Sequence, residues 1–266
     1  MSRIRRALTA TAVAASVALA VAGCTASTGE SATVETPSPT PVLGGDLTVF
    51  AAASLSPAFD EISAAFEAEN PAVDVQPIVY DGSSTLATQL LGGASADVFA
   101  SADEKNMAKV VDQSLASVTT LFASNTLVIA VPKGNPAQVD SITDLARPDV
   151  LTVLCAPEVP CGAASQRLLG NADLLVRPVS EEQNVSAVLT KVAVGEADAG
   201  LVYATDVIGR DDVESIVPRG AADVINEYPI TVMADAPNPD VAAAFIEFVT
   251  GPEGQKILAD LGFGAP

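Results

Sequence analysis

The chain has 266 residues, 49% of them hydrophobic and 17% charged, with 33 acidic and 13 basic side chains and a formal net charge of −20. This composition is typical of a globular protein, and so acidic a surface argues against nucleic acid and anionic lipid headgroups as partners. The sequence contains no histidine and only three cysteines. Ser-His-Asp and Cys-His catalytic units are therefore excluded, and any metal site would depend on carboxylates or thiolates.

The first part of the chain predicts export and tethering. Three arginines among the first six residues precede an apolar run at 7–20, which has the length of a signal-peptide core and is too short to span a bilayer comfortably. The run ends in a Val-Ala-Gly-Cys sequence that resembles a bacterial lipobox, so we expect a lipoprotein signal peptide at 1–23 and a lipid on Cys24. A plain secretory signal with an incidental cysteine is the alternative. Residues 24–44 are rich in Ser, Thr, Ala and Pro and predict a flexible tether.

These features predict a globular body held in the cell envelope, on the outer face of the cytoplasmic membrane, and bound to that membrane only through its lipid. With Cys24 used as the anchor, Cys155 and Cys161 remain, six positions apart across a Pro-containing loop. In an oxidising compartment we expect these two cysteines to pair. A two-thiolate metal site is the alternative, although the sequence offers it no nearby histidine or third cysteine.

Strands and helices are expected to alternate from Gly45 onward. The apolar spacing predicts strands at 47–50 and 97–100, an extended stretch at 73–80, and helices from a Ser54 cap to residue 70, from Ser83 to 91 and around 107–111. Strand and helix in alternation are typical of a parallel sheet.

A second set of alternating elements begins after an apolar strand at 127–131. Strands and helices are expected at 151–154, 163–169, 185–194 and 200–203, followed by an extended stretch at 228–233 and amphipathic helices at 241–250 and 254–261. A chain that enters a second lobe and returns to the first fits a two-lobed binding protein with a hinge. We expect one lobe to comprise 45–125 and 231–266 and the other 126–230. No internal sequence repeat is visible.

Four segments share one design, in which a strand ends, a short polar or Gly-containing turn follows, and a helix starts. They lie at 53–54, 82–84, 160–162 and 183–185. Helix N-termini leave backbone N–H groups unpaired and carry a partial positive charge, so several that converge on a cleft form an anion site without a cation. A single serine at a helix start is more often a cap than a ligand.

Several short sequence motifs follow one another along the chain. They are TVFAAASL at 48–55, GSSTLA at 82–87, ADVFASAD at 96–103, PEVPCG at 157–162, GLVYATD at 200–206, YPI at 228–230 and a Phe- and Gly-containing ending at 245–263. In this order they closely resemble the periplasmic molybdate-binding proteins of ABC importers, from about residue 45 to the end.

The resemblance implies an α/β protein with the type II periplasmic-binding-protein fold. Each of its two lobes would be a mixed, mainly parallel sheet flanked by helices, and two crossover strands would join the lobes. The resemblance also implies a monomeric receptor that is not an enzyme and needs no cofactor. Its partners would be molybdate or tungstate, a membrane permease and the ATPase of that permease.

The same resemblance places a tetrahedral oxyanion between the lobes, with no bare metal cation. The matching positions are Ser54 and Ser83, which would donate through hydroxyl and backbone N–H, Cys161 and Val185, which would donate through backbone N–H, and Tyr203, which would donate through its phenol. Cys161 stands where members of the family often have alanine, and a disulfide there would stiffen the turn without removing its N–H. Tyr203 can also be interpreted as a half-buried aromatic of an apolar strand.

The chemistry of the anion narrows the choice of ligand. A fully deprotonated dianion only accepts hydrogen bonds, so a lining of donors suits it and a nearby carboxylate repels it. Molybdate, tungstate and the smaller sulfate are of this kind, whereas phosphate retains protons and needs an acceptor as well. Ser84 and Thr85 stay candidates in case the register differs by one.

Other functions remain open at this point. The alternatives are a receptor for another tetrahedral oxyanion such as sulfate or phosphate, a secreted hydrolase built on paired carboxylates or a Ser-Lys unit, and a structural lipoprotein. A ferric-ion receptor is disfavoured because the sites of such receptors are built from clustered tyrosines, and this sequence has only three tyrosines.

Overall fold

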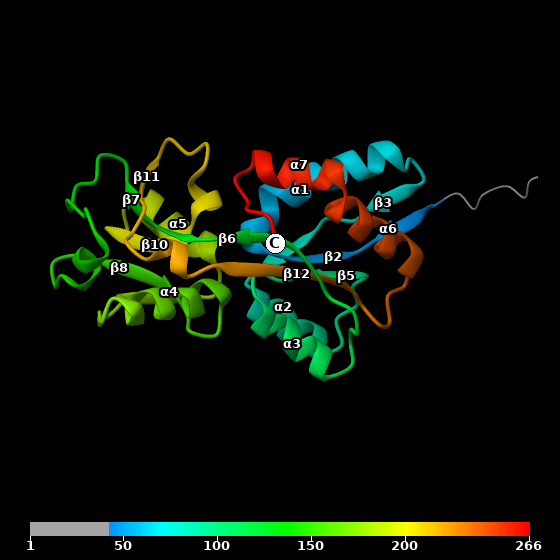
Figure 1. Cartoon of the computed structure of the whole chain (residues 1–266), viewed down its shortest axis with the longest axis horizontal. Coiled ribbons are helices and arrows are strands. Elements are labelled where there is room, and N and C mark those ends of the chain that lie inside the picture. The colour runs from blue at the N-terminus through cyan, green and yellow to red at the C-terminus, as the bar shows by residue number, and fades with distance from the viewer. Residues whose placement is uncertain (1–42) are drawn as a thin grey trace, which may run out of the picture. The chain divides into compact units, whose positions relative to one another are not determined.

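The computed structural model describes residues 43–266, and most of this part of the chain is built around two five-stranded sheets (Figure 1). The expected signal peptide, the lipid-bearing Cys24 and nearly all of the tether lie outside the described residues. None of the helices within 43–266 combines the length and hydrophobicity that a bilayer crossing requires.

The sheet of the first lobe has the strand order β4-β2-β5-β12-β6. Its strands are β2 (Val49–Ala52), β4 (Val79–Asp81), β5 (Val98–Ala100), β6 (Thr120–Asn125) and β12 (Asn226–Val232), and a small parallel pair is formed by β1 (Gly45–Leu47) and β3 (Val73–Val75). The helices of this lobe are α1 (Ser56–Glu69), α2 (Ser83–Leu91), α3 (Glu104–Asp112), α6 (Pro239–Thr250) and α7 (Pro252–Asp260). β2 runs parallel to β4 and β5, while β12 runs antiparallel to β5 and β6.

The sheet of the second lobe has the order β11-β7-β10-β8-β9. Its strands are β7 (Leu127–Pro132), β8 (Thr152–Cys155), β9 (Ser180–Glu182), β10 (Ala199–Tyr203) and β11 (Val213–Ile216), and its helices are α4 (Pro160–Asn171) and α5 (Val185–Ala193). β8 runs parallel to β9 and β10, and β7 runs antiparallel to β10 and β11. Each sheet is therefore mixed, with a parallel half and an antiparallel half.

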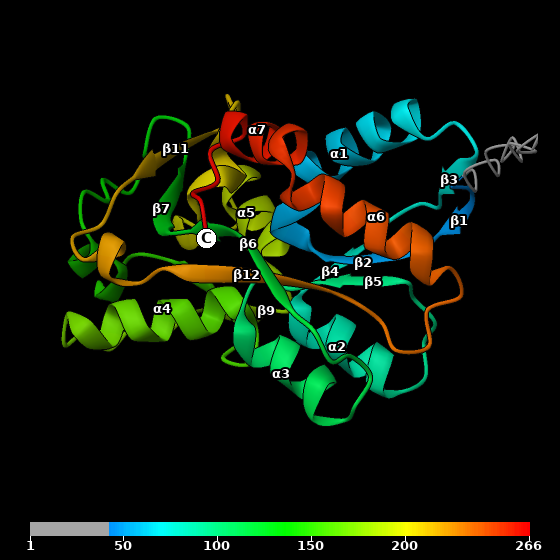
Figure 2. The same ribbon diagram turned by 45° about the vertical axis from the view of Figure 1, so that its right-hand side comes forward.

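Two strands carry the chain between the lobes. β6 leads through Thr126 directly into β7, and the chain returns to the first lobe along β12. The two crossings meet where Asn125 of β6 pairs with Asn226 of β12, and Figure 2 shows β6 and β12 passing between the two groups of elements. The expected two-lobed α/β fold with two crossover strands is confirmed. We propose the lobe limits 45–125 with 231–266 and 126–230, of which the first border falls between β6 and β7 and the return border falls inside β12.

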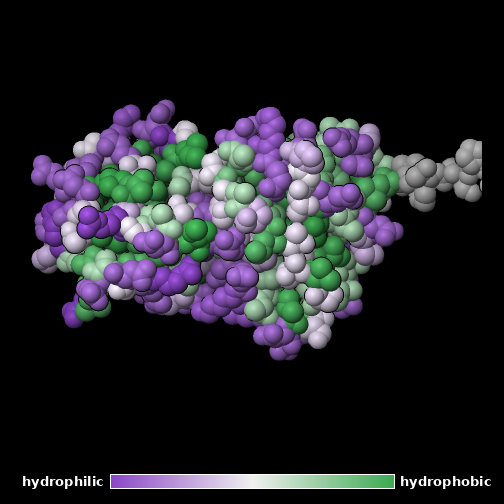
Figure 3. All heavy atoms as spheres, viewed as in Figure 1, coloured by the Kyte–Doolittle hydropathy of each residue, from purple (hydrophilic) through white to green (hydrophobic). Residues whose placement is uncertain are grey.

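The hydrophobic interior is divided in the same way. One cluster of buried side chains belongs to the second lobe and includes Leu127, Val153 and Val188, and a separate cluster in the first lobe includes Phe59, Phe122 and Phe245. On the face drawn in Figure 3, hydrophilic and hydrophobic residues interleave across both lobes. Each lobe thus has its own core, which allows the two to move as separate bodies about the crossing strands.

The strands of the two five-stranded sheets that the sequence does not predict are β6, β9 and β11. All three lie at the edge of a sheet, and several of their side chains are exposed or half-buried. An edge strand has only one paired neighbour and needs no continuous apolar run, so the hydrophobic pattern that identifies central strands is missing.

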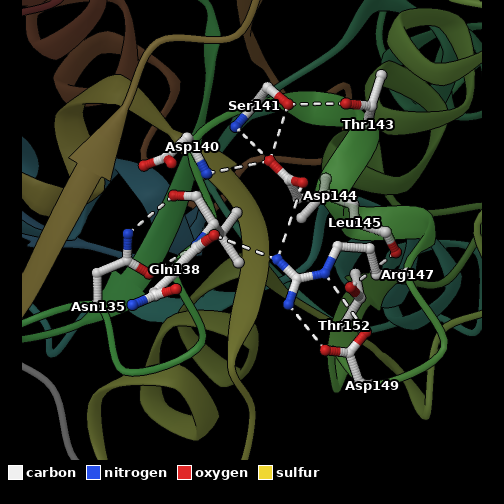
Figure 4. A network of polar contacts seen from close by, with 11 residues as sticks. Asn135, Gln138, Asp140, Ser141, Thr143, Asp144, Leu145, Arg147, Asp149 and Thr152 are labelled. Atoms are coloured by element: carbon white, nitrogen blue, oxygen red, sulfur yellow. Dashed lines mark hydrogen bonds and ion pairs between the residues drawn. The ribbon is translucent and has the colours of Figure 1, made fainter.

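A polar network holds the connection between β7 and β8 (Figure 4). Asp144 Oδ2 accepts hydrogen bonds from the Ser141 hydroxyl and from the backbone N–H groups of Asp140 and Ser141. These hydrogen bonds, led by that from the Ser141 side chain, lower the pKa of Asp144. Thr152 at the start of β8 donates to the carbonyl of Leu145, 3.0 Å away, so the loop is anchored to the strand that leads toward the cavity described next.

Candidate functional site

A small cavity lies where turns and helix starts of both lobes meet. Its lining consists of Ala52, Ala53, Ser54, Asp81, Gly82, Ser83, Ala102, Val159, Pro160, Cys161, Asn184, Val185 and Tyr203. All five residues that the resemblance singled out are among them. The volume that the centre of a water-sized sphere can occupy in this cavity is only about 10 Å³, which is roughly enough for one water molecule. The cavity in this arrangement of the lobes is therefore far too small for a sugar or a peptide, and a small oxyanion requires the lining to move apart around it.

Ser83 is the first residue of α2 and is fully buried. Its Oγ accepts a hydrogen bond from the Ala102 N–H at 2.9 Å, so the hydroxyl proton remains available to a ligand. The preceding Gly82 is needed for the approach of the lobes, since a Cβ there would lie 2.0 Å from the carbonyl oxygen of Gln183 in the second lobe.

Ser54 lies in a single 3₁₀ turn, Ala53–Leu55, between β2 and α1. The prediction that Ser54 caps a helix is wrong, because the extra turn moves the start of α1 to Ser56 and makes Leu55 its N-cap. The Ser54 hydroxyl instead lies 3.1 Å from the hydroxyl of Tyr228, and either group can donate. The serine is buried at the cavity without a capping role.

In the second lobe, Cys161 is the second residue of α4, and it forms the expected disulfide with Cys155 at the end of β8. The two-thiolate metal site is thereby excluded, and no group of three or more metal-ligating side chains occurs anywhere in the described residues. A Cβ on the next residue, Gly162, would lie 1.9 Å from the carbonyl oxygen of Ala156. The helix start is thus pressed directly against the end of β8.

Val185 opens α5, and Asn184 caps it by accepting from the Ala187 N–H at 2.9 Å. Ser83, Cys161 and Val185 all lie in the first turn of their helices, where backbone N–H groups have no acceptor within the helix. Three helix N-termini therefore direct N–H groups and partial positive charge toward the cavity.

Tyr203 ends β10 and is 1% exposed. Its hydroxyl accepts a hydrogen bond from Asn226 Nδ2 at 2.8 Å. Burial, together with the neighbouring Tyr228, Asp103 and Asp206, raises the pKa of Tyr203 well above its ordinary value. The phenol therefore stays protonated, and it can donate to a ligand while it accepts from Asn226.

The lining also contains a carboxylate, so the expectation of a lining made of donors alone is wrong in this respect. Asp81 Oδ1 accepts from the Gly82 N–H at 2.7 Å and from Asn184 Nδ2 at 2.9 Å, and the second bond joins the two lobes. The lining, drawn wholly from the described part of the chain, includes no lysine or arginine. Positive potential at the cavity comes from backbone and hydroxyl dipoles.

The sequence analysis assigned no role at the site to Asp81, Asn184, Asn226 or Tyr228. Asn184 lies within a helix start that the sequence marked and Asp81 stands next to one, and that position is the one available signal for them. Asn226 and Tyr228 lie in the returning strand β12, and only the folded arrangement brings them next to Tyr203 and Ser54.

Known proteins resemble this chain along most of its described length. The family model described as bacterial extracellular solute-binding protein matches residues 47–264. The molybdate-binding protein ModA of Mycobacterium tuberculosis is 45% identical, over 83% of this chain and 85% of that protein. The molybdate-binding protein ModA of Escherichia coli is 33% identical, over 82% of this chain and 89% of that protein.

Two solved structures show the same fold. The periplasmic molybdate-binding protein of Azotobacter vinelandii has a TM-score of 0.72 at 22% identity, covering 83% of this chain and 99% of that one. The sulfate-binding protein SubI of Mycobacterium tuberculosis has a TM-score of 0.71 at 18% identity, covering 82% and 86%. The matches in sequence and in fold lead to one conclusion: the chain belongs to the bacterial extracellular solute-binding protein family.

Proposed function

We propose that the protein captures molybdate, and tungstate with it, and delivers the anion to an ABC permease powered by its ATPase. The observation that carries this proposal is the convergence of hydroxyl and backbone donors from both lobes on one small cavity whose lining includes no cation. The relatives named as molybdate-binding proteins support the choice of ligand. In this role the protein binds and releases its ligand without catalysing a reaction and without a cofactor.

The ligand-binding residues that we propose are Ser54, Ser83, Cys161, Val185 and Tyr203. Ser54, Ser83 and Tyr203 would donate through hydroxyl groups, and Cys161 and Val185 through backbone N–H groups. Hydrogen bonds from neutral donors to a charged group contribute about 1.5–3 kcal/mol each in a buried site. Five of them, aided by three helix N-termini, offset the cost of removing a dianion from water.

The proposal includes a closing motion. The cavity is bounded by residues of both lobes, and Asp81 and Asn184 join the lobes beside it. A ligand that contacts both lobes stabilises their approach, and the crossing strands β6 and β12 supply the hinge. We expect the radius of gyration from small-angle scattering to fall when molybdate is added. At a hundredfold excess over the dissociation constant, ligand should stabilise the folded protein by about 2.7 kcal/mol.

We also propose that the mature protein is a monomer anchored outside the cytoplasmic membrane by a lipid on Cys24. The lipobox-like sequence supports the anchor, and family membership supports the compartment. Mass spectrometry of the protein from cell envelopes tests the anchor, which is contradicted by an unmodified Cys24 or by a cleavage site elsewhere.

A receptor for sulfate is the second candidate, because the fold also matches a sulfate-binding protein. Sulfate shares the charge and shape of molybdate and is smaller, so the size of the closed cavity must separate the two. The available space is small enough that a modest difference in lobe closure would decide the preference.

Calorimetric titration of the mature chain with molybdate, tungstate, sulfate and phosphate tests the proposal. We expect saturable one-to-one binding of molybdate and tungstate and weaker binding of sulfate and phosphate. Sulfate binding tighter than molybdate binding would identify a sulfate receptor instead. Binding of none of the four anions would overturn the oxyanion site itself.

A further inference from the structure

We infer that Asn226 is a positioning residue of this site, which holds the Tyr203 hydroxyl so that it donates into the cavity and thereby favours fully deprotonated oxyanions over protonated ones. The inference rests on the proposed oxyanion-binding function and deepens it. Asn226 does not line the cavity, and it acts through Tyr203.

The hydrogen bonds of Asn226 fix the orientation of its amide. Asn226 is 3% exposed at the start of β12, and its Oδ1 lies 2.9 Å from Arg167 Nη2. A guanidinium group only donates, so the amide oxygen must face Arg167. The amide nitrogen then donates both of its protons, one to the Ala102 carbonyl at 2.9 Å and one to the Tyr203 hydroxyl at 2.8 Å. A reversed amide would place an N–H group against Arg167 and an oxygen against the Ala102 carbonyl.

This orientation sets the polarity of the Tyr203 hydroxyl. A phenol has one proton to donate, and here a lone pair of its oxygen is engaged by the amide of Asn226. The proton is directed away from Asn226, and the acceptors on that side are the hydroxyl of Tyr228 and a ligand in the cavity. An anion is the stronger acceptor of the two, so Tyr203 donates to it when it is bound.

Ser83 is held in the same sense by the same segment of chain. The Ala102 N–H donates to Ser83 Oγ at 2.9 Å, and the Ala102 carbonyl accepts from Asn226. The hydroxyls of Ser83 and Tyr203 therefore each accept a hydrogen bond from a neighbouring N–H group and keep their own proton to donate. An oxyanion that carries a proton needs an acceptor from the site, and a hydroxyl that already accepts one hydrogen bond has one lone pair fewer to supply. Asp81, the carboxylate in the lining, can still accept, because Gly82 and Asn184 both bind its Oδ1 atom. The selectivity assigned to Asn226 is therefore the part that Tyr203 contributes.

A double-mutant cycle tests the inference. Asn226→Leu keeps the shape of the side chain and removes its hydrogen bonds, and Tyr203→Phe removes the hydroxyl. We expect Asn226→Leu to weaken molybdate binding about five- to tenfold in the wild-type background and less than twofold in the Tyr203→Phe background. Phosphate binding should change less than molybdate binding, so the molybdate-to-phosphate affinity ratio should fall.

The matched control is Thr231→Val. Thr231 is buried in the same strand β12, but its hydroxyl donates to the Val118 carbonyl at 2.7 Å and has no contact with Tyr203. The control variant should leave the molybdate-to-phosphate affinity ratio unchanged, and its effect on molybdate affinity should add to that of Tyr203→Phe. Should Asn226→Leu fail to fold, Asn226→Asp keeps the oxygen toward Arg167 and replaces the donating nitrogen with an acceptor. The Tyr203 hydroxyl would then turn to the introduced carboxylate, and we expect the ratio to fall further.

An equal loss in both backgrounds, an unchanged ratio, or wild-type affinity in Asn226→Leu would each overturn the inference. The proposed function fails separately, when the wild-type protein prefers another anion to molybdate. When that anion is sulfate, the same cycle is measured with sulfate and retains its meaning, whereas a preference for phosphate overturns the inference as well. Binding of no oxyanion by the wild-type protein overturns both.

Discussion

The two lobes place corresponding elements around the cavity. Strands β9-β8-β10-β7-β11 of the second lobe occupy the places of β4-β2-β5-β12-β6 in the first, with the same relative directions. Helices α2 and α5 both begin at the cavity, and both are followed by a glycine with positive φ, Gly93 at 91° and Gly195 at 75°. After each glycine the chain reaches an Ala-Asp pair and then a central strand.

The aspartate of each Ala-Asp pair makes the same hydrogen bonds in its lobe. Asp97 accepts from the backbone N–H of Thr48 at 2.8 Å, and Asp198 accepts from that of Leu151 at 2.8 Å. In return, the N–H of each aspartate donates to the carbonyl of the same partner residue. A repeat of this kind leaves almost no trace in the sequence, because it depends on a left-handed glycine and one carboxylate rather than on a run of side chains.

The chemistry that each lobe presents to the cavity differs. The first lobe contributes two serine hydroxyls, from Ser54 and Ser83, together with the N–H groups at the start of α2. The second lobe contributes the N–H groups of Cys161 and Val185 and the phenol of Tyr203. Side-chain donors can be removed by mutation and backbone donors cannot. The comparison therefore predicts which substitutions at equivalent places affect affinity and which affect stability.

The largest effect is expected for Ser83→Asp. It places a carboxylate where water is excluded, beside a dianion that cannot adapt by taking up a proton. We expect molybdate affinity to fall by at least about a thousandfold, measured by calorimetry. Ser83→Asn, similar in size and neutral, should lose much less. Near wild-type affinity in Ser83→Asp would show that the anion does not bind at the start of α2.

Two glycines at helix starts in different lobes distinguish closure from folding. The Cβ of Gly82→Ala would clash with Gln183 across the lobes, whereas that of Gly162→Ala would clash with Ala156 inside the second lobe. Gly82→Ala should lower affinity more than tenfold and abolish ligand-induced compaction in scattering, with little change in the melting temperature without ligand. Gly162→Ala should lower the melting temperature without ligand, because we expect it to reduce the free energy of unfolding by about 1–3 kcal/mol. The reverse pattern would contradict the assignment of these contacts.

Removal of single hydroxyls comes next in size. Ser54→Ala and Ser83→Ala should each weaken molybdate binding by about 1.5–3 kcal/mol, or ten- to a hundredfold. Neither serine side chain caps a helix. Ser83→Ala nevertheless removes the acceptor of the Ala102 N–H and Ser54→Ala removes a partner of Tyr228, so melting temperatures should also fall and affinity must be measured separately. Val185→Ala in the second lobe retains its N–H and is the control, with less than threefold loss expected. A large loss in Val185→Ala would show that its side chain rather than its backbone matters.

Sequence reasoning predicted the elements with a strong apolar pattern and not the others. Central strands such as β7 and helices such as α6 were found, while the edge strands β6, β9 and β11 were not. Ser54 lines the cavity, but the local reason given for it was wrong, since hydrophobic spacing does not distinguish a 3₁₀ turn from the first turn of an α-helix.

The residues of the candidate site also fall into those that local sequence patterns indicate and those that such patterns do not. Ser83 and Val185 could be placed because helix starts carry local signals. Tyr203 came only from the family resemblance, because nothing near it in sequence indicates that its hydroxyl reaches a cavity. Asp81 and Asn226 were not predicted, since their roles arise from contacts between lobes or between β12 and β10 that no local pattern encodes.

The shared aspartates offer a comparison of stability rather than affinity. Asp97 is buried and accepts from the N–H groups of both Thr48 and Asn238, through different oxygens, at 2.8 and 2.7 Å. Asp198 is half-buried and accepts from Leu151. Asparagine can replace one accepting oxygen but not two. In urea unfolding without ligand, Asp97→Asn should cost about 2–3 kcal/mol and Asp198→Asn about 1 kcal/mol or less. Equal losses would show that the second hydrogen bond contributes nothing.

The smallest effect is expected for Asp81→Asn, and its sign is the informative part. The substitution removes a negative charge from the cavity while an amide oxygen can still accept from Gly82 and Asn184. Molybdate affinity should rise about three- to tenfold at low ionic strength, and the gain should shrink as salt is added.

Glu182→Gln is the control for net charge, because Glu182 ends β9 as Asp81 ends β4. Its carboxylate is paired with Lys191 and Ser180 and does not line the cavity, so affinity should stay within twofold of wild type. If Asp81→Asn instead weakens binding, the carboxylate contributes more by joining the closed lobes than it costs by repelling the anion. The first lobe would then act on the ligand through closure as well as through its two hydroxyls.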